Sequence, residues 1–293
     1  MKAFVVTAPK TFEIQDVAEP KAGAGEIVAQ VERVGVCGTD VEFFNGDMSY
    51  LASGEAHFPL RIGHEWCGRV ISVGSSVDPR WIGKFVTSDT MLGCQKCERC
   101  KSGYQYLCAD RDEVGIRRGF PGALAEKLVI PSFAVHELPN DMDPAIGAMV
   151  EPTGNALRAV DATKLKSGDR LLIFGPGTIG LLCALIAQSR GIEVHVVGVD
   201  EKSLAFASQF GFAGVHAQHS IPKIVVHSII DATFGEDVPA LAGKLDIMRT
   251  QLDAERRRQD IGQLQRLALG VQLAAQGAAQ FAAHQHRGRA DDL

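Results

Sequence analysis

A cysteine, a histidine and a carboxylate stand in three separate segments of this chain, and together they have the chemistry of a metal site. Cys37 precedes Gly-Thr-Asp, His64 follows a glycine, and Glu151 precedes Pro-Thr-Gly. A catalytic zinc is held by such a mixture of thiolate, imidazole and carboxylate, because one position must stay open for water or substrate. Alone, a cysteine is more often a small buried apolar residue, and a histidine beside a glutamate more often belongs to a solvated loop. The three segments together favour Cys37, His64 and Glu151 as zinc ligands.

Glu65 follows His64 directly and is a second candidate carboxylate. It could orient the metal ligands without binding the metal itself, or it could bind the metal intermittently in exchange with water. The plainer interpretation is a carboxylate that is hydrogen-bonded to backbone or to an arginine. Cys67, two residues further, is expected in the core.

Four of the seven cysteines lie between positions 94 and 108 and form the most specific motif in the chain. These residues are Cys94, Cys97, Cys100 and Cys108. Four thiolates in short loops can close around one tetrahedral zinc, and an odd, clustered set of cysteines argues against the disulfide framework of a secreted protein. An iron–sulfur cluster or a redox-active cysteine pair would use similar spacings.

A glycine-rich turn between a predicted strand and a predicted helix could bind a dinucleotide. Residues 170–174 are predicted as a buried strand and 181–190 as a helix, with Gly-Pro-Gly-Thr-Ile-Gly between them. In this order the motif is the dinucleotide fingerprint, whose glycines let a pyrophosphate approach the positive end of the helix. The residues expected to contact the cofactor are Gly175, Gly177, Thr178, Ile179 and Gly180. Asp200 ends the next predicted strand (194–199). Asp200 could accept hydrogen bonds from the hydroxyls of the adenosine ribose and so favour NAD over NADP, or it could cap the helix predicted at 203–210.

Composition excludes several classes of protein. The 293 residues are 46% hydrophobic and 22% charged, as in a globular chain, and no apolar run approaches the roughly 20 residues of a membrane span. The formal charge of -5 gives no reason to expect nucleic acid or anionic lipid as a partner. The N-terminal apolar run is too short for a signal peptide, so a cytoplasmic protein is expected.

The pattern of predicted secondary structure changes at Gly168. Up to about residue 92, short strands broken by turns are predicted at 3–7, 12–17, 26–36, 69–73 and 84–87, which suggests a compact antiparallel domain. A strand-like stretch at 122–131 follows the cysteines, and a helix is expected around 155–160. Beyond residue 168, strands alternate with helices, with a third strand at 224–230 and a helix at 237–245.

These motifs resemble the zinc-dependent medium-chain dehydrogenase/reductase family, especially its sorbitol and threonine dehydrogenase branch. The residues that fit the family's zinc signature are Gly63, His64, Glu65, Gly68, Gly74 and Val77, and residues 37–40 fit its first-ligand loop. The resemblance implies an α/β fold with a GroES-like β-rich catalytic domain (1–152) and a Rossmann cofactor-binding domain (153–245, incomplete). It implies one catalytic zinc and one structural zinc at the four cysteines.

The same resemblance implies a function. The chain would transfer a hydride between a secondary alcohol or polyol and NAD, with NADP possible, and Thr39 would pass the proton away from the metal. Without the resemblance, Thr39 could equally cap the local turn. Many relatives carry histidine where this chain has Glu42, which leaves the proton exit open. The rival interpretation is a non-catalytic zinc-binding remnant that has lost cofactor binding; a zinc-free quinone reductase would not retain these ligands.

The resemblance stops near residue 245. Residues 246–293 are an atypical helical or disordered tail with eight Gln, one Phe, no Pro and no Lys, although five apolar residues between 261 and 271 fall on one helical face. A change of reading frame or a replacement helix would explain the break. Family members complete their sheet and pair their subunits through strands that this composition does not supply, so homo-oligomer formation is not expected to carry over.

Overall fold

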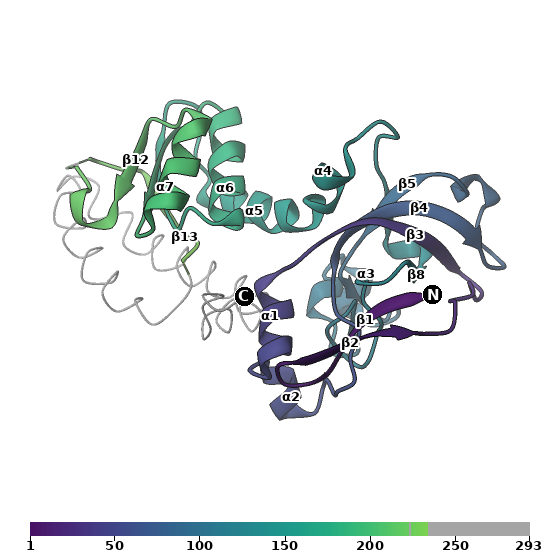
Figure 1. The fold of residues 1–293 in the computed structure, drawn as a ribbon. Helices are drawn as coiled ribbons and strands as arrows, with labels where there is room; N and C mark the ends of the chain where they lie inside the picture. Colours follow the sequence, from purple (N-terminus) through teal and green to yellow (C-terminus); the bar gives the residue numbers. More distant parts are fainter. Residues whose placement is uncertain (223, 234–293) are drawn as a thin grey trace. The chain divides into compact units, whose positions relative to one another are not determined.

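The computed structural model describes residues 1–222 and 224–233, which fall into two compact units (Figure 1). The first unit runs from Met1 to Glu151 and the second begins at Pro152. Among the described residues, no helix is long and apolar enough to cross a membrane. The predicted helix at 237–245 and the tail at 246–293 lie outside the described residues.

The first unit is built on a five-stranded antiparallel sheet with the order β8-β3-β4-β5-β9. Its strands are β3 (Glu26–Gly35), β4 (Glu65–Val73), β5 (Phe85–Ser88), β8 (Lys127–Pro131) and β9 (Val135–Glu137). Apolar residues of β3, β4 and β8 are buried together, with Ile27, Trp66 and Leu128 at 0% exposure. This confirms the β-rich character expected of the N-terminal part of the chain.

Smaller elements surround this sheet. Strands β1 (Lys2–Ala8) and β2 (Thr11–Asp16) form an antiparallel hairpin, and β6 (Met91–Leu92) pairs with β7 (Asp112–Glu113). The helices are α1 (Gly38–Asn45), α2 (Ser49–Ser53), α3 (Glu98–Lys101) and α4 (Pro144–Ala148). The segment after Cys37 was expected to be a loop, but it turns into α1 because Asp40 in its first turn accepts the Cys37 N–H and so satisfies an end of the helix.

The second unit holds a parallel four-stranded sheet with the order β12-β11-β10-β13. Its elements are α5 (Val150–Thr163, which starts at the end of the first unit), β10 (Arg170–Phe174), α6 (Thr178–Ser189), β11 (Glu193–Gly198), α7 (Glu201–Ala207), β12 (Gly214–Ala217) and β13 (Ser228–Asp231). Strands alternate with helices, and α6 and α7 lie side by side (Figure 1). This is the Rossmann arrangement, in which later strands add on either side of the first.

Alternating residues of the strands bury the two faces of this sheet. Leu171, Ile173 and Val196 pack with α5 and α6, whereas Leu172, Phe174 and Val197 belong to a separate cluster. The strand predicted at 224–230 was too early, because pairing with β10 begins at Ser228. Strand β12 was not predicted, since its four residues include a glycine and a histidine and give no apolar run.

Candidate metal and cofactor sites

The register between β3 and β4 brings the first two candidate metal ligands together. Gly35, the last residue of β3, lies opposite Glu65, the first residue of β4. Cys37 follows Gly35 by two residues and His64 directly precedes Glu65, so two segments separated along the chain emerge at the same end of the sheet. Antiparallel pairing alone therefore explains why a cysteine and a histidine 27 positions apart can share one ion.

Asp40 joins these two segments. Its Oδ2 accepts the Cys37 N–H at 2.9 Å, and its Oδ1 accepts the Gly63 N–H at 2.9 Å. The Asp40 side chain is buried, so these two hydrogen bonds are shielded from solvent. They hold the loop of Cys37 against the turn before His64. Sequence reasoning gave Asp40 no role, although its place three residues after Cys37 in the motif was the available signal.

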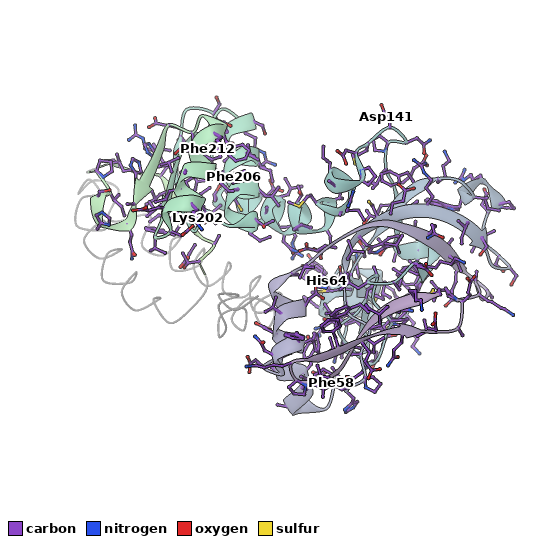
Figure 2. The ribbon with its side chains drawn as sticks, viewed as in Figure 1. Phe58, His64, Asp141, Lys202, Phe206 and Phe212 are labelled. Carbon is purple, nitrogen blue, oxygen red and sulfur yellow. The ribbon has the colours of Figure 1, made fainter. Side chains whose placement is uncertain are left out.

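Three donor atoms converge where these segments meet. One donor atom each from Cys37, His64 and Glu65 all lie within 4.8 Å of one another, and His64, labelled in Figure 2, is 1% exposed. The structure does not place Glu151 in this group of three. Its Oε1 instead accepts the Thr90 hydroxyl at 3.0 Å, although its charge acts on both His64 and Glu65.

The electrostatics of this group fit a divalent cation. Burial acts to lower the pKa of His64, but the negative charges of Asp40, Cys37 and Glu151 outweigh it and raise that pKa well above its usual value. Burial, with the charges of Glu151 and Asp40, raises the pKa of Glu65 to about 7. Several acidic groups thus lie close together in one buried place, where their negative charges repel one another. A bound metal cation would balance these charges, and the donor atoms present suit one.

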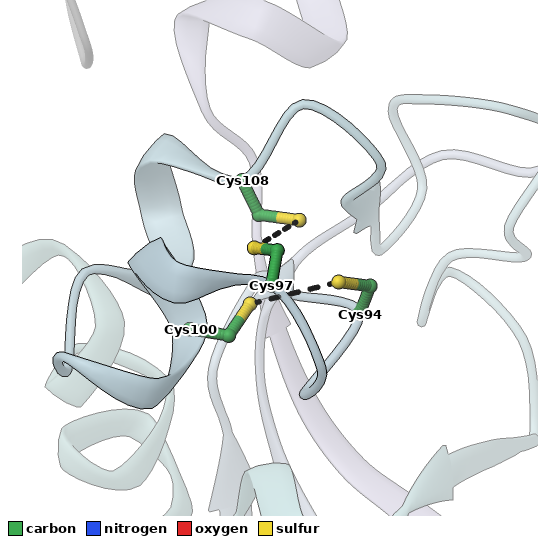
Figure 3. A group of neighbouring side chains, drawn as sticks. All are labelled: Cys94, Cys97, Cys100 and Cys108. Atoms are coloured by element: carbon green, nitrogen blue, oxygen red, sulfur yellow. Dashed lines mark hydrogen bonds between the residues drawn. The ribbon is translucent and has the colours of Figure 1, made fainter.

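The four clustered cysteines form a second candidate metal site. Their sulfur atoms all lie within 4.8 Å of one another, and none of the four is in a disulfide. Figure 3 shows the sulfurs turned toward a common centre, with Cys97 to Cys108 at 3.7 Å and Cys94 to Cys100 at 4.0 Å. A tetrahedral zinc with Zn–S bonds of 2.3 Å requires sulfurs about 3.8 Å apart. Backbone N–H groups of Lys96 and Cys97 lower the pKa of Cys94 to about 6, which favours the thiolate that metals bind.

A buried ion pair anchors this lobe to the rest of the first unit. Arg111 donates from Nη1 to the Cys108 carbonyl at 3.1 Å and from Nε to Glu113 Oε1 at 2.6 Å. Glu113 is fully buried and also accepts the Tyr50 hydroxyl at 3.3 Å. These residues were not predicted, because an arginine, a glutamate and a distant tyrosine make no recognisable motif.

The glycine turn in the second unit has the geometry of a pyrophosphate cradle. Gly175 has φ +93, and a Cβ on Gly180 would lie 1.8 Å from the Gly175 carbonyl oxygen, so both positions need glycine for the chain's own packing. A Cβ on Gly177, by contrast, would meet no atom of the described residues within 4 Å. Packing does not explain that glycine, and the predicted close approach of a phosphate would. Thr178 and Ile179 open α6, where first-turn N–H groups lack partners within the helix.

Asp200 occupies the position between β11 and α7. Its Oδ2 accepts the backbone N–H and the hydroxyl of Ser203, both at 2.7 Å, so it is the N-cap of α7. One oxygen can still accept from a ribose, and its cofactor role stays a prediction.

Two further cysteines and one histidine make other contacts. Cys67 and Cys183 are fully buried, and burial raises the pKa of Cys67 to about 11 and that of Cys183 to about 12, as expected for thiols in the core. His136 contacts Asp89 at 2.9 Å on the surface. Thr39 is fully buried in the first turn of α1, two residues after Cys37.

Comparison with known proteins places the chain in a family. A family model described as the alcohol dehydrogenase GroES-like domain matches residues 23–140. L-threonine 3-dehydrogenase of Cutibacterium acnes is 35% identical over 215 residues, which cover 72% of this chain and 61% of that protein. Sorbitol dehydrogenase of Halalkalibacterium halodurans is 32% identical over 263 residues, covering 85% of this chain and 74% of that protein. A dehydrogenase structure from Sinorhizobium meliloti, bound to NADP, matches with a TM-score of 0.73 and 27% identity over 81% of this chain and 71% of that one.

The chain belongs to the zinc-type medium-chain dehydrogenase family, as its motifs predicted. It spans about three fifths of the length of the Cutibacterium acnes L-threonine 3-dehydrogenase that it matches.

Proposed function

We propose that this chain is a zinc-dependent oxidoreductase that transfers a hydride between a secondary alcohol or polyol and a nicotinamide cofactor. The observation that carries the proposal is the convergence of Cys37, His64 and Glu65 donor atoms within 4.8 Å in a buried, acidic place. The names of the relatives support the substrate class, because L-threonine at its C3 and sorbitol both carry secondary hydroxyls. We assign catalysis to residues 1–152 and cofactor binding to 153–245.

Cys37, His64 and a carboxylate, either Glu65 or Glu151, would hold the catalytic zinc. When bound, the zinc supplies a Lewis acid that lowers the pKa of the substrate hydroxyl. The charge of Glu151 acts on both His64 and Glu65, so one carboxylate can serve as ligand while the other balances the charge of the site. Asp40 fixes the spacing of the two ligand segments through its bonds to Cys37 and Gly63.

Thr39 is the residue that we assign to proton transfer. It lies in the first turn of α1 beside Cys37 and is buried, so its hydroxyl can accept a proton from the substrate side and donate its own onward without bulk water. The proton balance requires both events together, because the hydroxyl must end neutral. The hydride leaves the alcohol carbon for the nicotinamide.

The glycine turn would bind the pyrophosphate of that cofactor. Gly177 leaves room for it, and the first-turn N–H groups of α6, which begins at Thr178, can donate to a phosphate. The Sinorhizobium meliloti neighbour bound to NADP supports a pyridine nucleotide, and Asp200 favours NAD through the ribose hydroxyls.

A second zinc at Cys94, Cys97, Cys100 and Cys108 would be structural, since four thiolates leave no position open. Reduced thiols in that arrangement are typical of a cytoplasmic protein.

The test combines zinc content per chain, calorimetric titration with NADH and NADPH, and oxidation of sorbitol and L-threonine followed by nicotinamide absorbance. We expect two zincs, binding of one nucleotide and turnover. His64→Ala should lose one zinc and reduce turnover by more than the roughly 10 to 100-fold that loss of a residue behind the ligands costs. Cys183→Ala, which removes a buried thiol from the second unit, is the matched control and should keep both zincs.

Two zincs without any nucleotide binding would instead establish the non-catalytic zinc-binding interpretation for this chain. Loss of the same zinc from Cys183→Ala would show that the measurement reports on folding rather than on the ligands.

A further inference from the structure

Two histidines on neighbouring strands of the second unit face each other at ligand distance. His195 on β11 and His216 on β12 have Nδ1 and Nε2, respectively, 3.1 Å apart, with their rings stacked at 5.3 Å between centroids. His195 is 7% exposed, and His216 is half-buried. Neither residue takes part in the candidate zinc sites or in the glycine turn.

A glycine makes this approach possible. In the parallel register His195 lies opposite Gly214, and His216 is two residues further along β12, so all three share one face of the sheet. A Cβ on Gly214 would lie 2.3 Å from His216 Nε2 and 2.5 Å from His195 Nδ1. Any other residue would therefore push the two imidazoles apart.

The far side of His195 is held in the way that metal-binding histidines are held. Its Nε2 lies 2.9 Å from Glu193 Oε1, and Glu193 accepts from Arg170 Nε at 2.7 Å and Nη2 at 3.2 Å. When the Nε2–H group of His195 donates a hydrogen bond to this carboxylate, Nδ1 carries the lone pair, and this lone pair is directed at His216. A carboxylate behind a histidine fixes the tautomer and strengthens the imidazole as a ligand.

The charges of Glu193 and His216 suit a metal site. Hydrogen bonds from Arg170 and His195 lower the pKa of Glu193 to about 2, so this carboxylate stays ionised. Burial and the nearby His195 lower the pKa of His216, which keeps that ring neutral.

We propose that His195 and His216 form a binding site for a divalent first-row transition-metal ion, with water in the remaining positions. Two imidazole nitrogens on a tetrahedral ion with bonds of 2.0 to 2.1 Å lie about 3.3 Å apart, close to the separation here. Imidazole suits Zn²⁺, Ni²⁺ and Cu²⁺, whereas Mg²⁺ and Ca²⁺ prefer oxygen. The ion would clip β12 to β11, and Glu193 extends the connection to Arg170 on β10.

Nickel is the probe that separates this site from the thiolate-containing ones. Protein that holds two zincs per chain is titrated calorimetrically with Ni²⁺, in a background with His284→Asn and His286→Asn because the His-Gln-His sequence could bind nickel by itself. We expect one Ni²⁺ per chain. His216→Asn should weaken its binding at least tenfold, and so should Gly214→Ala, which keeps both imidazoles but separates them.

His219→Asn is the matched control, because it removes an exposed imidazole three residues from His216 and should change the affinity less than twofold. Circular dichroism establishes that each variant is folded. Absence of nickel binding in the parent, unchanged binding in folded His216→Asn, or equal loss in His219→Asn would each overturn the proposal. The first outcome would leave the pair as a hydrogen bond between strands.

Discussion

Glu42 offers a sharp test of the electrostatics of the first unit. It lies on α1 with 5% of its surface exposed, and neither carboxylate oxygen has a hydrogen-bond partner among the described residues. Burial, with a smaller contribution from the charge of Asp47, raises its pKa from 4.5 to about 8. The folded protein should therefore carry Glu42 as a neutral acid at neutral pH.

The sign of the effect follows from proton linkage. Between pH 4.5 and 8 the folded chain holds the Glu42 proton and the unfolded chain does not, so the free energy of unfolding falls as pH rises through this window. Each pH unit in this window lowers the free energy of unfolding by about 1.4 kcal/mol, so the loss amounts to about 3 kcal/mol at pH 7. Glu42→Gln is neutral in both states and removes the cost. We expect the variant to match the parent within about 1 kcal/mol at pH 5 and to exceed it by about 3 kcal/mol at pH 7.

Urea unfolding of zinc-loaded protein at a series of pH values measures this difference. The two tryptophans of the chain, Trp66 and Trp81, both lie in the first unit, so their fluorescence reports on the unit that contains Glu42. Comparing parent and variant at each pH cancels the pH dependence of zinc binding. Glu13→Gln on the exposed face of β2 is the control and should show no such trend. A difference between Glu42→Gln and the parent that is constant from pH 5 to 8 would refute the reasoning.

Three further predictions concern the candidate sites. Gly180→Ala should destabilise the second unit by about 1–3 kcal/mol, because its Cβ would meet the Gly175 carbonyl; amide exchange of β10 measures this loss. Gly177→Ala should keep the fold and lower the nucleotide affinity about tenfold, which calorimetry measures. Cys100→Ser should lose one zinc per chain and open residues 94–108 to limited proteolysis, and an unchanged zinc content would contradict the four-cysteine site. Asp40→Ala should weaken catalytic zinc binding by about 10 to 100-fold, measured by chelator competition, with the four-cysteine zinc retained as internal reference.

Sequence reasoning worked best where chemistry is local. The four cysteines lie within 15 consecutive residues, so their spacing already limits how they can fold, and the structure brings their sulfurs together. The strand, glycine turn and helix from Arg170 to Ser189 are likewise contiguous, and β10 was predicted with its observed bounds. The family followed from the same short motifs.

It failed where an element is short or is set by its surroundings. Strand β12 has four residues and depends on pairing with β11, and α1 depends on Asp40 satisfying the N–H of Cys37. Hydrophobic periodicity contains neither kind of information, because both come from hydrogen bonds made after the chain has folded.

The sequence by itself therefore determined the family, the four-cysteine lobe and the strand–glycine turn–helix segment, since each is encoded in short stretches of consecutive residues. Only the tertiary structure decided which distant groups meet. The β3–β4 register places Cys37 beside His64 and Glu65, the β11–β12 register places His195 against His216, and packing of α1 buries Glu42. Register and burial are properties of paired strands and filled cores, so no single segment carries them.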